Sequence, residues 1–129
     1  MMQIKHIHHV AILTDNYELS KKFYTEILGF KIIAETYREA RDSYKLDLAI
    51  NGIYQVELFS FPDYRERGSY PEAKGLRHLA FAVDDVEASA AFLKSKDVDI
   101  QEVRLDELTG KKFVFFRDPN GQPLELYEA

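Results

Sequence analysis

Apolar and polar positions follow the same order in two segments of the chain. Residues 9–23 read HVAILTDNYELSKKF, and residues 78–92 read HLAFAVDDVEASAAF. Six positions are identical, namely His, Ala, Asp, Glu, Ser and Phe in that order. In each segment a short apolar run after the His predicts a strand, and a helical pattern follows it. The pattern therefore predicts two copies of one structural module.

The helical part of each copy is amphipathic. Residues 16–28 place apolar side chains at helical spacing and are followed by Gly29, a typical helix end. Residues 86–96 repeat this pattern in the second copy. We expect the strand after each helix to lie at residues 30–35 and 98–104.

Each copy closes with a predicted hairpin. In the first copy Asn51-Gly52, a strong type I′ turn signal, separates strands at residues 45–50 and 53–61. In the second copy the strands are residues 113–116 and 123–127. Each module therefore has the order βαβββ, and the fold class is α+β.

The two modules are predicted at residues 5–61 and 76–128, within a single domain of residues 1–129. The stretch between them, residues 62–75, is polar and contains two Pro and two Gly. This composition is typical of a linker.

Composition narrows the functional classes. The chain is 46% hydrophobic and 30% charged, as in an ordinary soluble globular protein. Its net charge is −5 with no basic block, which argues against nucleic-acid binding. No apolar run is long enough to span a membrane, and no signal-peptide pattern is present, so we expect a cytoplasmic protein. The absence of cysteine excludes disulfides, thiolate nucleophiles and Cys-ligated metals.

Each copy opens with a His-bearing strand and closes with a Glu-bearing strand. His9 precedes Glu57 by 48 residues (57 − 9), and His78 precedes Glu125 by 47 residues (125 − 78). Both glutamates stand between apolar neighbours, where a buried carboxylate needs a partner. Two imidazoles and two carboxylates suit Zn²⁺, Ni²⁺ or a similar ion. We therefore predict a divalent-metal site formed by these four residues.

A simpler interpretation exists for each residue taken alone. A strand Glu commonly faces solvent, and a lone His is more often a packing residue than a ligand. The repetition of the same His and Glu positions in both copies favours the ligand interpretation. Two further histidines, His6 and His8, are interpreted as surface or packing residues, with His8 as an alternative ligand to His9.

Five motifs covering nearly the whole chain resemble one known family. They are HHVAI, SKKFYTEILGF, YQVELFSF, GLRHLAFAVDD and DPNGQPLELYE. They are similar to motifs of the vicinal oxygen chelate superfamily, which includes glyoxalase I, bleomycin-resistance proteins and dioxygenases. The resemblance implies paired βαβββ modules that form a cupped mixed sheet around a metal.

The ligand set sorts the branches of that superfamily. His-Glu-His-Glu resembles bacterial glyoxalase I, whereas dioxygenases and fosfomycin enzymes use His-His-Glu and the methylmalonyl-CoA epimerase branch typically has Gln where Glu57 stands. The glyoxalase I-like (lactoylglutathione lyase-like) branch is therefore the closest match. It implies Zn or Ni as the cofactor, with Mn, Co or Fe as alternatives.

This branch implies an activity. We expect a metal-dependent lyase or isomerase acting on a small carbonyl–thiol adduct by proton abstraction and ene-diolate stabilisation. Glu125 corresponds to the usual base, and Glu57 would serve the other face of the substrate. Two alternatives stay open: another metal-dependent enzyme of the superfamily, such as an epimerase or thiol transferase, and a non-catalytic small-molecule-binding protein.

The sequence signals for substrate binding and for assembly are less specific than those for the metal site. The segment at residues 37–45 is rich in cations and aromatics, and Arg38, Arg41 or Lys45 could hold an anionic substrate tail. The alternative is a solvated loop with local ion pairs. Related proteins often build each site from two chains, which implies a homodimer with shared sites.

Overall fold

The computed structural model describes residues 1–68 and 70–129 of the 129-residue chain. The chain divides into two compact units, Met1–Arg65 and Glu66–Ala129. The division falls within the predicted linker, residues 62–75, in which Ser69 lies outside the described residues. That the two units form a single domain stays a prediction.

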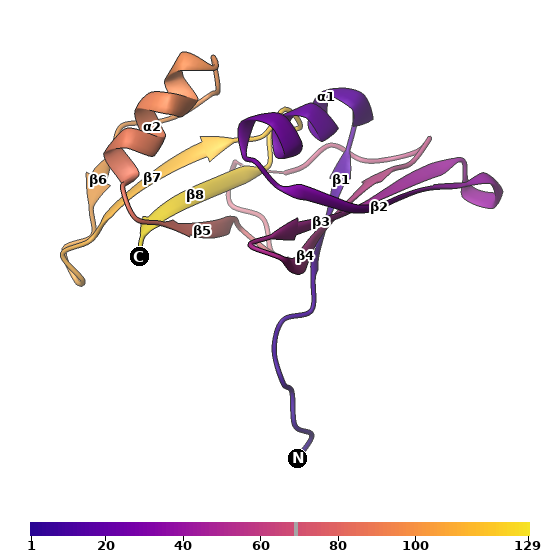
Figure 1. Ribbon diagram of the computed structural model, residues 1–129, viewed down its shortest axis with the longest axis horizontal. Coiled ribbons are helices and arrows are strands. Elements are labelled where there is room, and N and C mark those ends of the chain that lie inside the picture. The colour runs from indigo at the N-terminus through magenta and orange to yellow at the C-terminus, as the bar shows by residue number, and fades with distance from the viewer. Residues whose placement is uncertain (69) are drawn as a thin grey trace. The chain divides into compact units, whose positions relative to one another are not determined.

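The first unit contains a four-stranded mixed sheet in the order β1-β4-β3-β2 (Figure 1). Strand β1 runs parallel to β4, and the other neighbours are antiparallel. Its elements in chain order are β1 (Val10–Thr14), α1 (Tyr17–Lys22), a π-helical turn (Phe23–Ile27), β2 (Lys31–Arg38), a 3₁₀ turn (Glu39–Arg41), β3 (Ser43–Ile50) and β4 (Ile53–Ser60).

The second unit repeats this topology with the strand order β5-β8-β7-β6. Strand β5 runs parallel to β8, and the other pairs are antiparallel. The elements are β5 (Leu79–Val83), α2 (Val86–Ser95), β6 (Arg104–Leu105), β7 (Lys112–Arg117) and β8 (Pro123–Glu128). The prediction of an α+β fold with two βαβββ modules is therefore confirmed.

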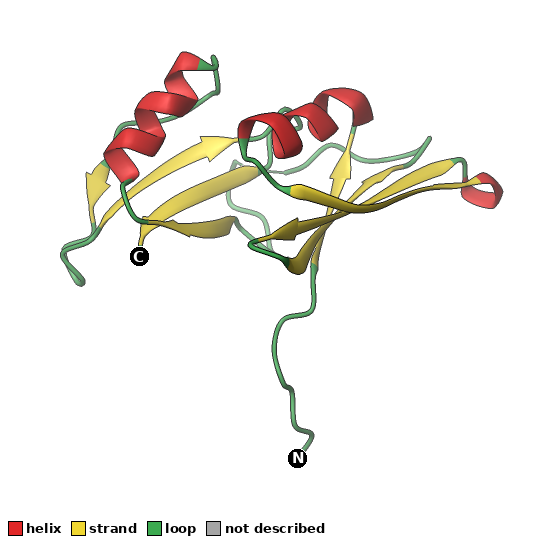
Figure 2. Cartoon of the chain, in the orientation of Figure 1, coloured by secondary structure: helices red, strands yellow, loops and turns green. Residues whose placement is uncertain are grey.

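In each unit the helix lies on one face of the sheet, as Figure 2 shows. In the second unit alternate strand residues are buried with the apolar face of α2. These buried residues are Val86, Ala90, Leu93, Val114, Phe116, Leu124 and Leu126. Because successive strand residues point to opposite faces, the residues between them, including Glu125, lie on the face without the helix. The same alternation puts Leu46, Leu48 and Leu58 in the core of the first unit and Glu57 on the opposite face.

Local signals account for the helix starts and the first hairpin. The side chains of Asn16 and Asp85 accept hydrogen bonds from main-chain N–H groups three residues on, as N-caps do. Asn51 and Gly52 both have positive φ, at 56° and 79°, which confirms the predicted type I′ turn.

Two predicted boundaries need correction. The helix predicted at residues 16–28 is α-helical only to Lys22 and continues as a π-helical turn. The strand predicted at residues 98–104 is mostly irregular, with a bridge at Ile100 and regular pairing only at Arg104–Leu105. The apolar-polar alternation of this segment reflects partial burial beside β7 and not a continuous ladder.

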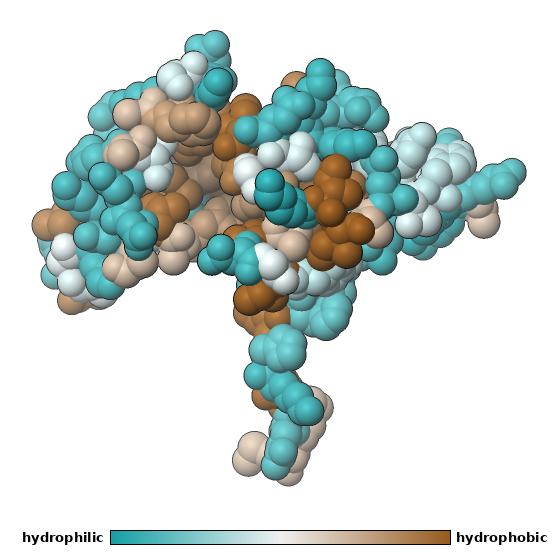
Figure 3. All heavy atoms as spheres, in the orientation of Figure 1, coloured by the Kyte–Doolittle hydropathy of each residue, from teal (hydrophilic) through white to brown (hydrophobic). Residues whose placement is uncertain are grey.

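No helix in residues 1–68 and 70–129 is long and apolar enough to cross a membrane. The first nine residues have no helix or strand and extend away from the sheet of the first unit (Figure 1). Both hydrophilic and hydrophobic residues are exposed along this arm (Figure 3), including Met2, Ile4 and Ile7. His9 stands at its end, directly before β1.

A small polar cluster joins α1 to β2. The Tyr17 hydroxyl donates to Glu35 at 2.6 Å, and the Lys21 ammonium donates to the same oxygen at 2.8 Å. The hydrogen bond from Lys21, followed by that from Tyr17, lowers the pKa of Glu35 below its ordinary value of 4.5. A carboxyl whose pKa is lower in the folded than in the unfolded state stabilises the fold at pH values above its unfolded-state pKa. This stabilisation is lost as the pH falls through the folded-state pKa.

Replacing Glu35 by Gln should therefore lower the free energy of unfolding at pH 7 by less than about 1 kcal/mol, because the pair is partly exposed. The difference from wild type should disappear well below pH 4.5, the ordinary pKa of this carboxyl. Urea unfolding at pH 7 and at strongly acidic pH measures both values. Glu26→Gln, an exposed change nearby, serves as the control. An equal loss for Glu35→Gln at both pH values would contradict this account.

Candidate metal centre

The first His–Glu pair is set by the register of two parallel strands. Ala11 on β1 lies opposite Glu57 on β4. His9 is two residues before Ala11, so it lies on the same face of the sheet. Its Nε2 atom contacts Oε2 of Glu57. The two side chains that the sequence predicts as ligands of the first module are thus brought together.

The second pair has the same register. Ala80 on β5 lies opposite Glu125 on β8, and His78 is two residues before Ala80. The Nε2 atom of His78 lies 3.7 Å from Oε1 of Glu125. Each module therefore uses the same two strand positions to present one imidazole and one carboxylate on the face opposite its helix.

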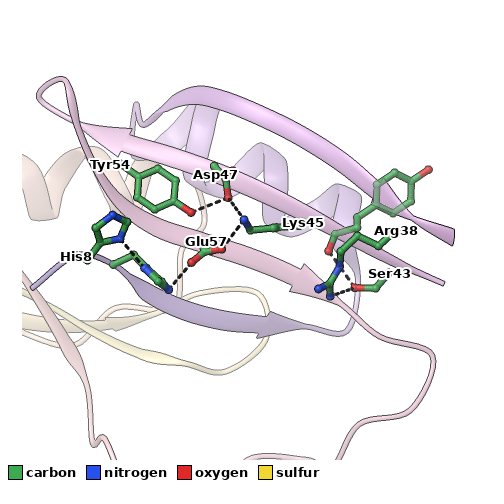
Figure 4. Close-up of polar contacts among 9 residues, drawn as sticks. His8, Arg38, Ser43, Lys45, Asp47, Tyr54 and Glu57 are labelled. Carbon is green, nitrogen blue, oxygen red and sulfur yellow. Dashed lines mark hydrogen bonds and ion pairs between the residues drawn. The ribbon is translucent and has the colours of Figure 1, made fainter. Parts of the chain in front are cut away.

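The surroundings of the two glutamates differ. Glu57 is 4% exposed, and the Lys45 ammonium lies 3.2 Å from its other oxygen. Figure 4 shows Lys45 pointing toward Glu57. Asp47 lies opposite Glu57 in the β3–β4 register. At the equivalent place in the second unit, Phe115 lies opposite Glu125. The carboxylate of Glu57 is held on both oxygens, whereas Glu125 pairs with His78 alone among the residues that the structure describes and faces an aromatic ring.

Lys45, Asp47 and Tyr54 form a polar layer around Glu57 that the sequence did not predict. The register shifts between Leu48 and Ala49, so that Gln55 has no partner on β3. Because of this β-bulge Tyr54 lies on the same side of the sheet as Glu57. Its hydroxyl donates to Asp47 at 2.8 Å (Figure 4). The alternation of Lys45 and Asp47 with buried leucines was the one signal that could have revealed this layer.

The charges in this layer shift two pKa values. The hydrogen bond to Glu57 is the largest effect on Lys45 and raises its pKa, so the ammonium stays charged. Burial, together with the carboxylates of Asp47 and Glu57, raises the pKa of the Tyr54 phenol. Tyr54 is therefore a neutral hydrogen-bond donor at neutral pH.

His8 lies beside the first pair. Its Nδ1 is 2.9 Å from Nδ1 of His9, and its ring contacts that of Tyr54 at a centroid distance of 5.4 Å. In this position His8 can orient the imidazole of His9 from behind, leaving Nε2 directed at Glu57. His6 is exposed on the arm.

The predicted substrate-binding cations lie in two different places. Lys45 forms ion pairs with Glu57 and, at 3.6 Å, with Asp47. Arg38 lies over the ring of Phe59 and donates to the Ser43 hydroxyl at 2.9 Å. Its Nε is buried without a hydrogen-bond partner among the described residues.

Arg41 lies over the ring of Phe61 at 4.9 Å, as Arg38 does at 5.5 Å. The segment is therefore not simply a solvated loop, because its two arginines stack on aromatic rings at the end of β4.

The donor set fits a divalent cation. Among residues 1–68 and 70–129, no group of three or more His, Asp or Glu side chains is close enough to hold a metal by itself. Each unit would supply two donors, one His and one Glu. The 3.7 Å between His78 and Glu125 is too long for a hydrogen bond, but it is near the roughly 3.3 Å that separates two ligands of one tetrahedral zinc. A buried carboxylate beside an imidazole is likewise a favourable ligand pair for such an ion.

The matching family model has the description glyoxalase/bleomycin resistance protein/dioxygenase superfamily and covers residues 6–126. The chain belongs to this superfamily. The match spans both modules and all four residues of the two His–Glu pairs. The resemblance inferred from the sequence motifs is confirmed at this level.

Two relatives in the superfamily match over nearly their full length. Uncharacterized protein YaeR of Escherichia coli K12 is 57% identical over 99% of both chains. Uncharacterized protein YwkD of Bacillus subtilis 168 is 56% identical over 98% of this chain and 99% of its own. The crystal structure of SMU.1112c superposes with a TM-score of 0.91 at 46% identity, covering 98% of this chain and all of that one.

More distant relatives in the superfamily have several activities. Metallothiol transferase FosB of Staphylococcus haemolyticus is 32% identical, covering 96% of this chain and 84% of its own. A lactoylglutathione lyase of Schizosaccharomyces pombe is 26% identical over 93% of this chain, and the match spans 46% of that protein. A 2-epi-5-epi-valiolone epimerase of an Actinomyces species is 27% identical. The superfamily thus joins lyases, epimerases and thiol transferases on one fold.

Proposed function

We propose that the protein is a metal-dependent lyase or isomerase of the glyoxalase I type, acting on a small carbonyl–thiol adduct. His9, Glu57, His78 and Glu125 would hold the metal, with Zn or Ni as the favoured ion. The observation that carries the proposal is the repeated register, which gives both units one His and one Glu on the same sheet face.

Bound at these four residues, a divalent ion would supply Lewis-acid stabilisation of negative charge on adjacent substrate oxygens. The chain's own residues would move the proton. Glu125 would remove it from the carbon beside the carbonyl and return it to the neighbouring carbon, as a general base and then a general acid.

The environments of the two glutamates support this division of roles. Lys45 and His9 hold both oxygens of Glu57, so this side chain has little freedom to leave its position. Glu125 contacts His78 at 3.7 Å and faces Phe115, so one of its oxygens is available for a substrate proton. Glu57 would act mainly as a fixed ligand on the other face of the substrate.

A homodimer with shared sites belongs to the proposal. In that arrangement His9 and Glu57 of one chain would combine with His78 and Glu125 of its partner. Among the described residues each unit brings together two of the proposed ligands, which is consistent with a site completed by a second unit, whether from the same or another chain.

The function is tested by reconstituting the protein with Zn²⁺ or Ni²⁺ and assaying methylglyoxal with a panel of thiols. Isomerisation of at least one hemithioacetal, abolished by chelation and restored by metal, is the expected result. The metal content should be measured in the same samples. Metal binding without turnover of any adduct would contradict the lyase assignment and favour an epimerase or thiol transferase, and absence of metal binding would favour a non-catalytic binding protein.

A further inference from the structure

The second unit contains a cavity of about 340 Å³ beside its His–Glu pair. Its walls include His78, Phe115 and four arginines, Arg67, Arg77, Arg104 and Arg117. A volume of this size is at the lower end of the range for small-molecule sites. His78, a predicted metal ligand, therefore lines a cavity large enough for a small substrate.

The cavity is positively charged within an acidic protein. Four arginines and two acidic residues, Glu72 and Asp99, line it, whereas the whole chain carries a net charge of −5. An excess of one charge sign around a cleft concentrates ligands of the opposite sign. An anionic ligand is thus the chemistry that this cavity favours.

Three of the arginines have partners within the protein. Arg67 donates to two main-chain carbonyls, at 3.0 and 2.8 Å. Arg77 pairs with Glu72 at 3.1 Å. Arg117 reaches the carbonyl of Gly121 at 3.4 Å. These contacts shape the wall and leave fewer N–H groups for a ligand.

Arg104 differs from the other three. Its guanidinium lies over the rings of Phe113 and Phe115, at 5.1 and 5.6 Å from their centroids. The guanidinium makes no hydrogen bond or ion pair to any residue that the structure describes, and Arg104 is exposed. Stacking on a ring fixes the plane of a guanidinium while its N–H edge remains available for bidentate contact with an oxyanion.

The same aromatic ring connects Arg104 to the proposed metal ligands. The ring of Phe115 meets that of His78 edge to face at a centroid distance of 5.0 Å, and Phe115 lies opposite Glu125 in the β7–β8 register. One ring therefore separates the guanidinium from the His–Glu pair. A small molecule could reach both at once.

We propose that Arg104 is the anion-binding group of this site and holds a carboxylate, phosphate or sulfonate of the substrate. The substrate would be a small anion whose charged group lies several bonds from the oxygens presented to His78 and Glu125. This inference rests on the proposed function for the role of those oxygens. The anion site itself requires no metal.

Titration of the metal-free, full-length protein with inorganic phosphate, followed by ¹H–¹⁵N NMR, tests the anion site. Phosphate should shift the signals of Arg104 and Phe115, and Arg104→Gln should weaken its binding about tenfold. Arg104→Lys should keep part of the affinity because it retains the charge without the planar fork. Lys94→Gln on α2 is the charge-matched control and should change the affinity less than about twofold.

Equal phosphate affinity in Arg104→Gln and wild type would overturn the assignment, as would an equal loss in Lys94→Gln. Thermal unfolding of each variant shows whether the fold is kept. Metal titration of Arg104→Gln separates this inference from the proposed function. Normal metal binding with weakened phosphate binding supports both, whereas phosphate binding that depends on Arg104 in a protein that binds no metal would support the anion site and contradict the proposed function.

Discussion

Replacing Glu125 by Gln is expected to lower kcat by about 10²–10⁴-fold, the usual contribution of a positioned general base. The amide keeps the size and one oxygen of the side chain but cannot accept the proton. Metal content should fall only in part, since Gln can still offer an oxygen ligand. The measurement is steady-state kinetics of the metal-reconstituted variant on the best thiol adduct, with metal analysis of the same sample.

Two matched changes control this experiment. Glu57→Gln should reduce metal affinity more than Glu125→Gln does, because Glu57 is the more deeply buried of the two proposed ligands and is held by Lys45. Glu107→Gln, an exposed change in the β6–β7 loop, should leave kcat unchanged. Wild-type turnover by Glu125→Gln would exclude Glu125 as the base.

His9→Ala and His78→Ala should each reduce metal affinity by more than about 100-fold, because loss of a ligand exceeds the 10–100-fold typical of losing an outer partner. His6→Ala is the matched control, since His6 is exposed on the arm. His8→Ala should have a smaller effect, through the orientation of His9. Competitive metal titration with a chelating dye measures these affinities.

Co-expression of His9→Ala with His78→Ala tests the shared site. In a symmetric dimer that pairs the two variants, one of the two sites has both histidines intact. Because about half of the co-expressed dimers pair the two variants, about a quarter of the wild-type activity should return. No recovery of activity in purified mixed dimers would show that each chain completes its own site. Unchanged metal affinity in both single variants would contradict the ligand assignment altogether.

The repeat and the local signals were sufficient to predict much of the fold. The Asn51-Gly52 turn, the two helix starts and the alternation on β4 and β8 depend on neighbouring residues, so their physical causes lie within short segments. The bounds predicted for the strand at residues 98–104 were wrong because its pairing is decided by β7, which lies later in the chain. Alternation alone cannot distinguish a paired strand from an irregular segment that is partly buried.

In the candidate site, too, features set by local sequence could be predicted, and contacts between distant segments could not. The repeat predicted one His and one Glu per module, and the parallel registers bring each pair together. The alternation of Lys45 with buried leucines indicated its face of the sheet, but the sequence did not show that it would contact Glu57, because that contact depends on the β3–β4 register. Arg104 was also missed, since its importance comes from the rings of Phe113 and Phe115 on another strand. Residues that act through contacts between distant segments become visible only in three dimensions.

Anomalous diffraction from crystals of the metal-loaded protein tests the central claim most directly. We predict one strong anomalous peak per site, bonded at about 2.0–2.2 Å to Nε2 of two histidines and to carboxylate oxygens of two glutamates. The four ligands should be His9, Glu57, His78 and Glu125, from one chain or from two. A metal bound elsewhere, or bound without these side chains, would contradict the account.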